Sequence, residues 1–108
     1  MSASQARIVL STAGAEPQAR LIARQLVDER LAACVNLVPK IESHYWWKGK
    51  LQREAEVLLL FKTSQTKLAR LEKNILAHHP YDTPEFLVLT LTKGNERYLG
   101  WLAQSVQS

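Results

Sequence analysis

The sequence predicts an α+β fold of the ferredoxin-like type, with the chain order β-α-β-β-α-β followed by a C-terminal helix. Two observations support this prediction. Segments with strand-like patterns alternate with segments of helical periodicity in that order. The two middle strands are also separated only by a short turn around Gly49, which is typical of a hairpin. Such a sheet is antiparallel and carries its two crossover helices on one face.

The first strand and helix are expected at the N-terminus. Residues 7–13 (RIVLSTA) are rich in strand-forming side chains and end at Gly14. Pro17 suits the first turn of the following helix, because an amide hydrogen would lack a partner there. Apolar residues then recur at helical spacing at Ala19, Ile22, Ala23, Leu26 and Val27. We expect this stripe to pack against the sheet.

A long strand is expected over residues 32–47, where the pattern changes to a period of two. One side of it would carry Ala33, Val35, Leu37, Pro39, Ile41, Tyr45 and Trp47. Pro39 cannot donate a ladder hydrogen bond, so we expect it to bend the strand or to lie at an edge or bulge.

The return strand over residues 54–63 is apolar on both sides in its middle, because Val57 to Phe61 run without a polar residue. Two helices can cover only one face of the sheet. Burial of apolar surface is worth about 25 cal/mol per Å², and the aromatic run 45–47 adds further apolar surface. We therefore expect copies of the chain to cover the second face in a closed homo-oligomer.

The second helix is expected over residues 64–79, capped by Thr63 or Ser64 and ended by Pro80. Its inward residues would be Leu68, Leu71 and Ile75. A last strand is expected within residues 85–94. The terminal helix would be capped by Asn95, with Tyr98, Trp101 and Leu102 on one side.

Length and charge limit the classes of function. The 108 residues are expected to form one domain, 1–108, and the formal net charge is +4. Basic residues are interleaved with acidic ones, so we expect no nucleic-acid partner. No apolar run is long enough for a signal peptide or a membrane span, so no membrane partner is expected. A lone Cys34 fits a reducing compartment and a cytoplasmic location.

The residues that could ligate a soft or borderline metal are Cys34, His44, His78 and His79. Their spacing matches no metal motif, so a site would need distant segments or several chains. Cys34 could equally be a buried strand residue. His79 could be a ligand in the rigid loop HHPYDTPE, or only a residue that ends a helix. No nucleophile or general-base constellation accompanies Glu54 and Glu56, so no enzyme is predicted.

Three stretches nevertheless resemble one family. ERLAACVNLVP, YWWKGKLQREAEVLLLFKT and HHPYDTPEFLVLTLTKGNERYLGWL resemble the CutA family of divalent-cation tolerance proteins, in order and over nearly the whole chain. The resemblance implies a homotrimer built like the PII signalling proteins and a role in tolerance of copper and other divalent cations. It also implies that Cys34 and His79 are the family's characteristic cysteine and histidine.

The resemblance further implies a ligand cleft near a subunit interface, at Trp47, Glu56, Lys62 and Tyr81. The chain departs from the family pattern at Ser11, where some members have a second cysteine, and at Thr90, where proline is common. Glu42 and His44 replace usually smaller or apolar residues, so His44 could be an additional ligand or a tolerated surface change.

Two hypotheses follow. The first is a cytoplasmic homotrimer that requires no cofactor and binds copper or a similar divalent cation weakly through Cys34 and His79, with His44 contributing. The second is a PII-like trimer whose interface clefts hold an anionic or polar small molecule, with a structural Cys34 and no physiological metal. Metal and metabolite titrations separate these hypotheses.

Overall fold

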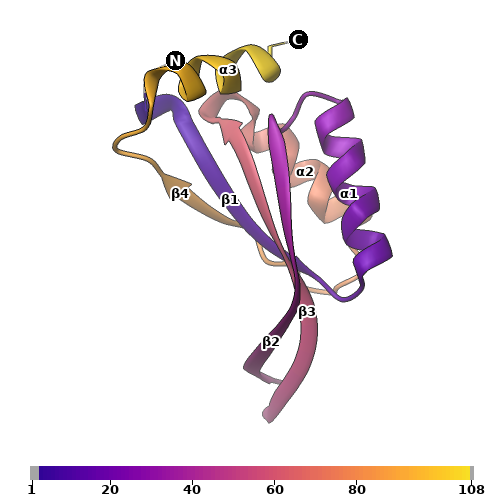
Figure 1. Ribbon diagram of the computed structural model, residues 1–108. Helices are drawn as coiled ribbons and strands as arrows, with labels where there is room; N and C mark the ends of the chain where they lie inside the picture. Colours follow the sequence, from indigo (N-terminus) through magenta and orange to yellow (C-terminus); the bar gives the residue numbers. More distant parts are fainter. Residues whose placement is uncertain (1–2, 108) are drawn as a thin grey trace.

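The computed structural model describes residues 3–107 and confirms the predicted α+β fold and element order (Figure 1). The strands are β1 (Ala6–Ala13), β2 (Cys34–Trp47), β3 (Lys50–Ser64) and β4 (Leu87–Thr90). The helices are α1 (Glu16–Asp28), α2 (Leu68–His78) and α3 (Glu96–Ser105), with short 3₁₀ turns η1 (Ala3–Gln5) and η2 (Gln65–Lys67). The strands form one antiparallel sheet in the order β2-β3-β1-β4, which is the ferredoxin-like arrangement.

Helices α1 and α2 cover one face of this sheet and form the main core with it. The buried residues of this core include Val9, Leu59 and Phe61 from the strands and Ile22, Leu26, Leu71 and Ile75 from the helices. The inward positions predicted for α2 are therefore confirmed. In α1 the stripe is narrower than predicted, since Val27 is 41% exposed. Its neighbour Leu26 takes the core position, and the next residue of a helix turns away by about 100°.

The hairpin of β2 and β3 extends beyond the two helices (Figure 1). Its turn consists of Lys48 and Gly49, with φ angles of 51° and 76°, the left-handed values that a tight two-residue hairpin turn requires. The register shifts between Val38 and Ile41, and Lys40 has a φ of 60°. Pro39 thus lies at a bulge on an edge strand, as predicted.

The prediction that Thr63 or Ser64 caps α2 is wrong. Thr63 Oγ1 donates a hydrogen bond to the Leu31 carbonyl at 2.8 Å, and Ser64 Oγ pairs with Thr66 Oγ1 at 2.9 Å. Neither hydroxyl satisfies a helical amide, and the chain enters α2 through η2 instead. The end of the helix is as predicted, because His79, before Pro80, has the extended angles φ −84° and ψ 134°.

The last strand is shorter than the apolar run 85–94 suggests. Only Leu87–Thr90 pair with β1. Asn95 caps α3 as predicted, with its Oδ1 accepting from the Tyr98 amide at 3.0 Å. Leu99 and Leu102 are the buried residues of α3, whereas Tyr98 and Trp101, which lie side by side with ring centroids 5.3 Å apart, are exposed. The buried side packs on Ala6, the first residue of β1, and on Ala33, just before β2.

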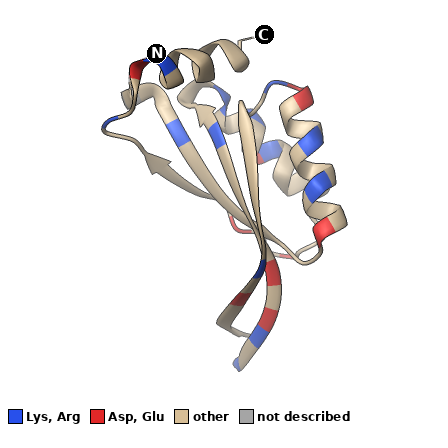
Figure 2. Cartoon of the chain, viewed as in Figure 1, with Lys and Arg blue, Asp and Glu red and all other residues tan. Residues whose placement is uncertain are grey.

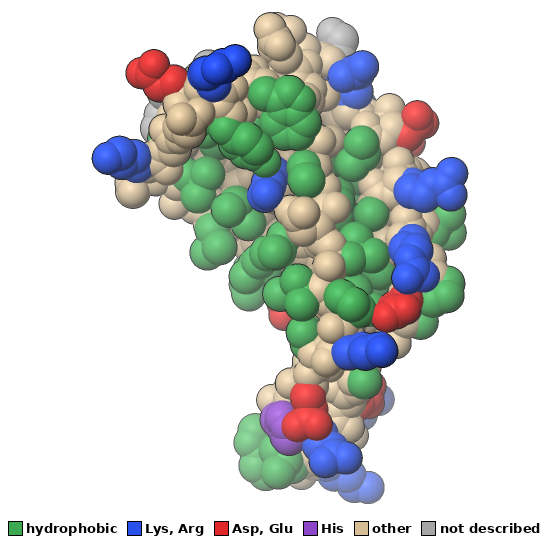
Figure 3. Space-filling view, in the orientation of Figure 1, with side chains coloured by type: hydrophobic (Ala, Val, Ile, Leu, Met, Phe, Trp, Pro, Cys, Tyr) green, Lys and Arg blue, Asp and Glu red, His purple; other side chains and the backbone are tan. Residues whose placement is uncertain are grey.

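The second face of the sheet, here called the open face, carries no helix along most of its length. Cross-strand partners share a face, and the registers place these apolar residues on the open face: Ile8, Leu10, Val38, Leu58, Leu60, Leu87 and Leu89. Val38, Leu87 and Leu89 are exposed. Apolar side chains gather over the strands in this view (Figure 3). Helix α3 approaches this face at one end, where the Tyr98 ring lies 5.6 Å from Lys62 Nζ.

Ser11 is a weak point in the helix-covered core. Its side chain is fully buried, and its Oγ has no hydrogen-bond partner among the described residues. An unpaired buried hydroxyl costs stability, so Ser11→Ala is expected to raise the free energy of unfolding by about 1 kcal/mol. Urea unfolding at fixed protein concentration measures the change. A loss of stability of similar size would show that the hydroxyl has a partner in solution.

Candidate functional site

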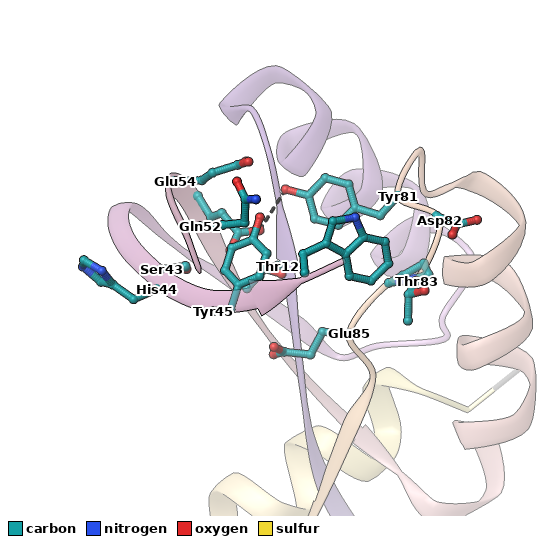
Figure 4. A pocket seen from close by; sticks show the side chains of 13 residues that line it. Thr12, Ser43, His44, Tyr45, Gln52, Glu54, Tyr81, Asp82, Thr83 and Glu85 are labelled. Carbon is teal, nitrogen blue, oxygen red and sulfur yellow. Dashed lines mark hydrogen bonds between the residues drawn. The ribbon is translucent and has the colours of Figure 1, made fainter. Parts of the chain in front are cut away.

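An open cleft of about 780 Å³ lies between the β2–β3 hairpin and the loop that follows α2 (Figure 4). Its lining comprises Thr12, Ser43, His44, Tyr45, Trp47, Gln52, Glu54, Glu56, Tyr81, Asp82, Thr83, Pro84 and Glu85. The hairpin supplies one wall, and residues 81–85 supply the other. The cleft therefore joins segments that are distant in the sequence.

The alternation of strand side chains builds the hairpin wall. Ser43 is the cross-strand partner of Glu54, and Tyr45 is the partner of Gln52. Partners share a side of the hairpin, and residues two apart in a strand share it too. Trp47 and Glu56 extend the same two rows. In contrast, the side chain of His44 points away from the cavity (Figure 4).

His79 fixes the loop wall. This residue is 8% exposed, its Nε2 donates to the Thr12 carbonyl at 2.6 Å, and its Nδ1 accepts from the Tyr81 amide at 3.1 Å. The Tyr81 hydroxyl then donates to Glu56 Oε2 at 2.8 Å, shown as a dashed line in Figure 4. Gly14 permits this approach, because a Cβ there would lie 3.0 Å from the Tyr81 oxygen.

The cleft is strongly acidic. Glu54, Glu56, Asp82 and Glu85 line it, and no lysine or arginine of the described residues does so. Figure 2 shows acidic positions on the hairpin strands and on the loop beside them. Burial, the hydrogen bond to Glu56 and the nearby carboxylates raise the pKa of Tyr81 well above its ordinary value. Loss of solvation and the neighbouring Glu54 raise the pKa of Tyr45.

Glu85 provides a test of this electrostatic description. Burial, followed by repulsion from Glu56, raises the pKa of Glu85 above its ordinary value. A carboxyl whose pKa is raised by folding favours the folded state in its protonated form, so its contribution is lost as the pH rises through the folded pKa. Glu85→Gln is therefore expected to raise the melting temperature at pH 7, with the gain disappearing in acid. A gain that is equal at both pH values would contradict this origin.

Three of the four predicted cleft residues, Trp47, Glu56 and Tyr81, line the same cleft. Lys62 does not. It is the cross-strand partner of Ile8 and Cys34 on the open face, and its Nζ lies 5.6 Å from the centre of the Tyr98 ring. Within one chain, Lys62 is therefore separated from Glu56 by six residues of β3, about 20 Å along the strand.

The three predicted metal ligands do not meet within one chain. Cys34 shares a row of the sheet with Ile8 on the open face, four residues along β1 from Thr12, which is a separation of about 13 Å along the strand. His79 uses both ring nitrogens in hydrogen bonds. His44 is exposed, with its Nε2 2.8 Å from Glu42 Oε2. Within residues 3–107, no three histidine, cysteine or acidic side chains are grouped to hold a metal ion.

Sequence reasoning missed several lining residues, chiefly Thr12, Gln52, Asp82 and Glu85. The loop sequence HHPYDTPE and the alternation of Glu54 with Glu56 were visible signals. What was not visible was that the hairpin and this loop face each other, because the contact depends on the Tyr81–Glu56 hydrogen bond across 25 positions.

The fold and the site define a small ferredoxin-like α+β protein with an acidic cleft at the base of a long hairpin. The chain belongs to the CutA family, since the family model described as "CutA1 divalent ion tolerance protein" matches residues 7–105. The resemblance noted in the sequence is thereby confirmed. The family is named for tolerance of ions and not for a reaction.

Individual relatives agree with this assignment. The divalent-cation tolerance protein CutA of Yersinia pestis is 47% identical over 106 residues, covering 98% of this chain and 89% of the relative. Protein CutA 1 of rice, described as chloroplastic, is 43% identical over 93% of this chain, which spans 56% of the length of that relative. The solved structure of rice CutA1 is 41% identical, covers 98% of both chains and superposes with a TM-score of 0.93.

Proposed function

We propose that this protein is a homotrimeric, non-catalytic divalent-cation tolerance protein that binds copper or a similar divalent cation weakly in the acidic cleft. The observation behind this proposal is the segregation of charge. Four acidic and no basic side chains of the described residues line the cleft, although the chain as a whole carries a net charge of +4. Such a cleft concentrates cations by its electrostatic potential.

The donor atoms favour weak binding. Carboxylate and hydroxyl oxygens suit hard divalent cations, whereas Cu²⁺ also accepts imidazole nitrogen. His44, at the rim of the cleft, is the nearest candidate nitrogen donor. Cys34 lies on the open face and His79 is occupied by hydrogen bonds, so either residue would become a ligand only through assembly or rearrangement.

Assembly as a trimer is supported by the open face and by the sheet edges. Val38, Leu87 and Leu89 on the open face are exposed, and β2 and β4 are edge strands. Copies that pack open face to open face would bury this surface in a closed arrangement. Both the open face and the hairpin would then lie at or near subunit contacts.

The metal proposal is tested by calorimetric titration of Cu²⁺ into protein purified without a histidine tag and stripped with chelator. The Glu54→Gln and Glu56→Gln variants are expected to weaken binding, whereas Glu96→Gln, on α3 outside the cleft, serves as the matched control. Cys34→Ser, His44→Ala and His79→Ala test the ligands suggested by the sequence. Unchanged binding in both cleft variants would remove the cleft from the metal site.

A PII-like small-molecule role is the second candidate, and the size of the cleft favours it. A volume of about 780 Å³ lies in the range of small-molecule sites and exceeds that of an ion. The absence of basic side chains from the described lining argues against an anionic ligand. Thermal-shift measurements with nucleotides, metabolites and metals compare the two roles, because a ligand of the folded state raises the melting temperature.

We further propose that the protein is cytoplasmic. Its partners would be copies of itself and divalent cations, and neither nucleic acid nor membrane. The single free thiol of Cys34 supports a reducing compartment. No helix within residues 3–107 is long and apolar enough to cross a membrane. The solved CutA of Archaeoglobus fulgidus, 32% identical with a TM-score of 0.91 over 94% of this chain and 99% of that chain, is described as periplasmic. Fractionation of cells that express the protein tests the location.

A further inference from the structure

We infer that the acidic cleft is a site for an organic cation, a small molecule that carries a primary or quaternary ammonium group. The inference goes beyond cation tolerance and does not depend on metal binding. It rests on the combination of three aromatic side chains with separated carboxylates in one cleft of suitable size. A bare metal ion would make no use of the aromatic ring faces.

The aromatic rings are the first part of the argument. Tyr45, Trp47 and Tyr81 all line the cleft, with two rings from the hairpin and one from the opposite loop. Ammonium groups bind to the faces of such rings within about 6 Å of the ring centre, and tryptophan is the best of them. The chain already shows this affinity, because Lys48 Nζ lies 5.9 Å from the centre of the Trp47 ring. Lys48 does not line the cleft, so this contact leaves the cleft itself without a cation.

The arrangement of the carboxylates is the second part. Glu56 is only 8% exposed and is held in place by the Tyr81 hydroxyl. Burial, and after it the negative charge of Glu56, raises the pKa of Glu85. Yet no three acidic, histidine or cysteine side chains of the described part of the chain are close enough to coordinate a metal ion. Divalent metals need several oxygen ligands within about 2.0–2.6 Å. Negative charge that is spread around a cleft suits a larger cation.

The size of the cleft is the third part. About 780 Å³ falls within the roughly 300–1,000 Å³ of typical small-molecule sites. The cleft is partly open to solvent within one chain, so the ligand is expected to keep part of its surface in water. Thr12, Ser43 and Thr83 supply hydroxyl groups for the polar end of such a molecule.

The test uses metal-free, full-length protein in its native assembly, in buffer with chelator. Tetramethylammonium chloride and 1,4-diaminobutane are titrated by NMR, with neopentyl alcohol, 1,4-butanediol and sodium chloride at matched ionic strength as neutral and ionic controls. Saturable shifts of amides in residues 43–56 and 81–85 are expected with the two amines only. Equal shifts with the neutral compounds, or no saturable shift with either amine, would overturn the inference.

Two adjacent tryptophans provide a matched pair of variants. Trp47→Ala removes a ring of the cleft, whereas Trp46→Ala removes the neighbouring ring, which is outside the lining. The loss of one cation–π contact is expected to weaken amine binding about fivefold in Trp47→Ala, with little change in Trp46→Ala. Glu56→Gln is expected to weaken it further. Equal affinity in the wild-type, Trp47→Ala and Glu56→Gln proteins would place the amine elsewhere. The chelator keeps these results independent of metal binding.

Discussion

Replacement of Leu60 by aspartate is expected to convert the assembled protein into single folded chains. Leu60 lies in the middle of the open face, opposite Leu10 on β1 and Asn36 on β2. Its side chain is only half-buried within the chain, so an aspartate there can reach water while the subunit stays folded. In a trimer the same carboxylate would be buried against apolar residues without a partner, at a cost of about 3–5 kcal/mol per subunit.

Sedimentation and circular dichroism together measure this result. The wild-type protein is expected to sediment as three chains and Leu60→Asp as one, with similar helix content in both. Leu21→Asp is the matched control, because Leu21 is 65% exposed on α1 and lies away from the open face. A variant that keeps the wild-type mass would show that this face is not the interface. A wild-type protein that is itself a single chain would contradict the trimer.

The fold was predictable because its signals are local. The Gly49 turn, the Pro80 stop and the Asn95 cap each depend on residues within a few positions, and all three appear in the structure. The prediction of the Ser64 or Thr63 cap failed for the opposite reason. The Thr63 hydroxyl donates a hydrogen bond to the carbonyl of Leu31, 32 positions away. A pattern of neighbouring residues cannot predict such a distant partner.

The candidate site was predictable only in part, for the same physical reason. Trp47 and Glu56 fall on one side of the hairpin through simple alternation. Lys62 lies on the same face of β3 as Glu56, but six residues along the strand, a separation of about 20 Å that places it beside Cys34 and away from the cleft. The bulge at Pro39 changes the register of the hairpin, and the contact of Tyr81 with Glu56 sets the opposite wall. Pro39 makes the bulge predictable from the sequence, whereas the contact of Tyr81 with Glu56 is set by the tertiary structure.

His79→Ala is expected to destabilise the protein by about 3 kcal/mol, because it leaves two partly buried backbone groups without their hydrogen-bond partner at about 1–3 kcal/mol each. These groups are the Thr12 carbonyl and the Tyr81 amide. The ring contact between His79 and Tyr81, with centroids 4.5 Å apart, is lost as well. Urea unfolding of chelator-treated protein at a fixed chain concentration measures the change, since stability of an oligomer depends on concentration.

The adjacent histidine is the control that separates structure from metal binding. His78 is exposed, and its Nδ1 bonds only to the Asn74 carbonyl one turn earlier, so His78→Ala should change the free energy of unfolding by no more than about 0.5 kcal/mol. If His79 served only as a metal ligand, His79→Ala would weaken copper binding and leave the metal-free protein as stable as the wild type. Because of the hydrogen bonds of His79, we instead expect His79→Ala to lose much of its stability even without metal, and to have a more mobile loop at residues 81–85. Two variants of equal stability would refute this structural role.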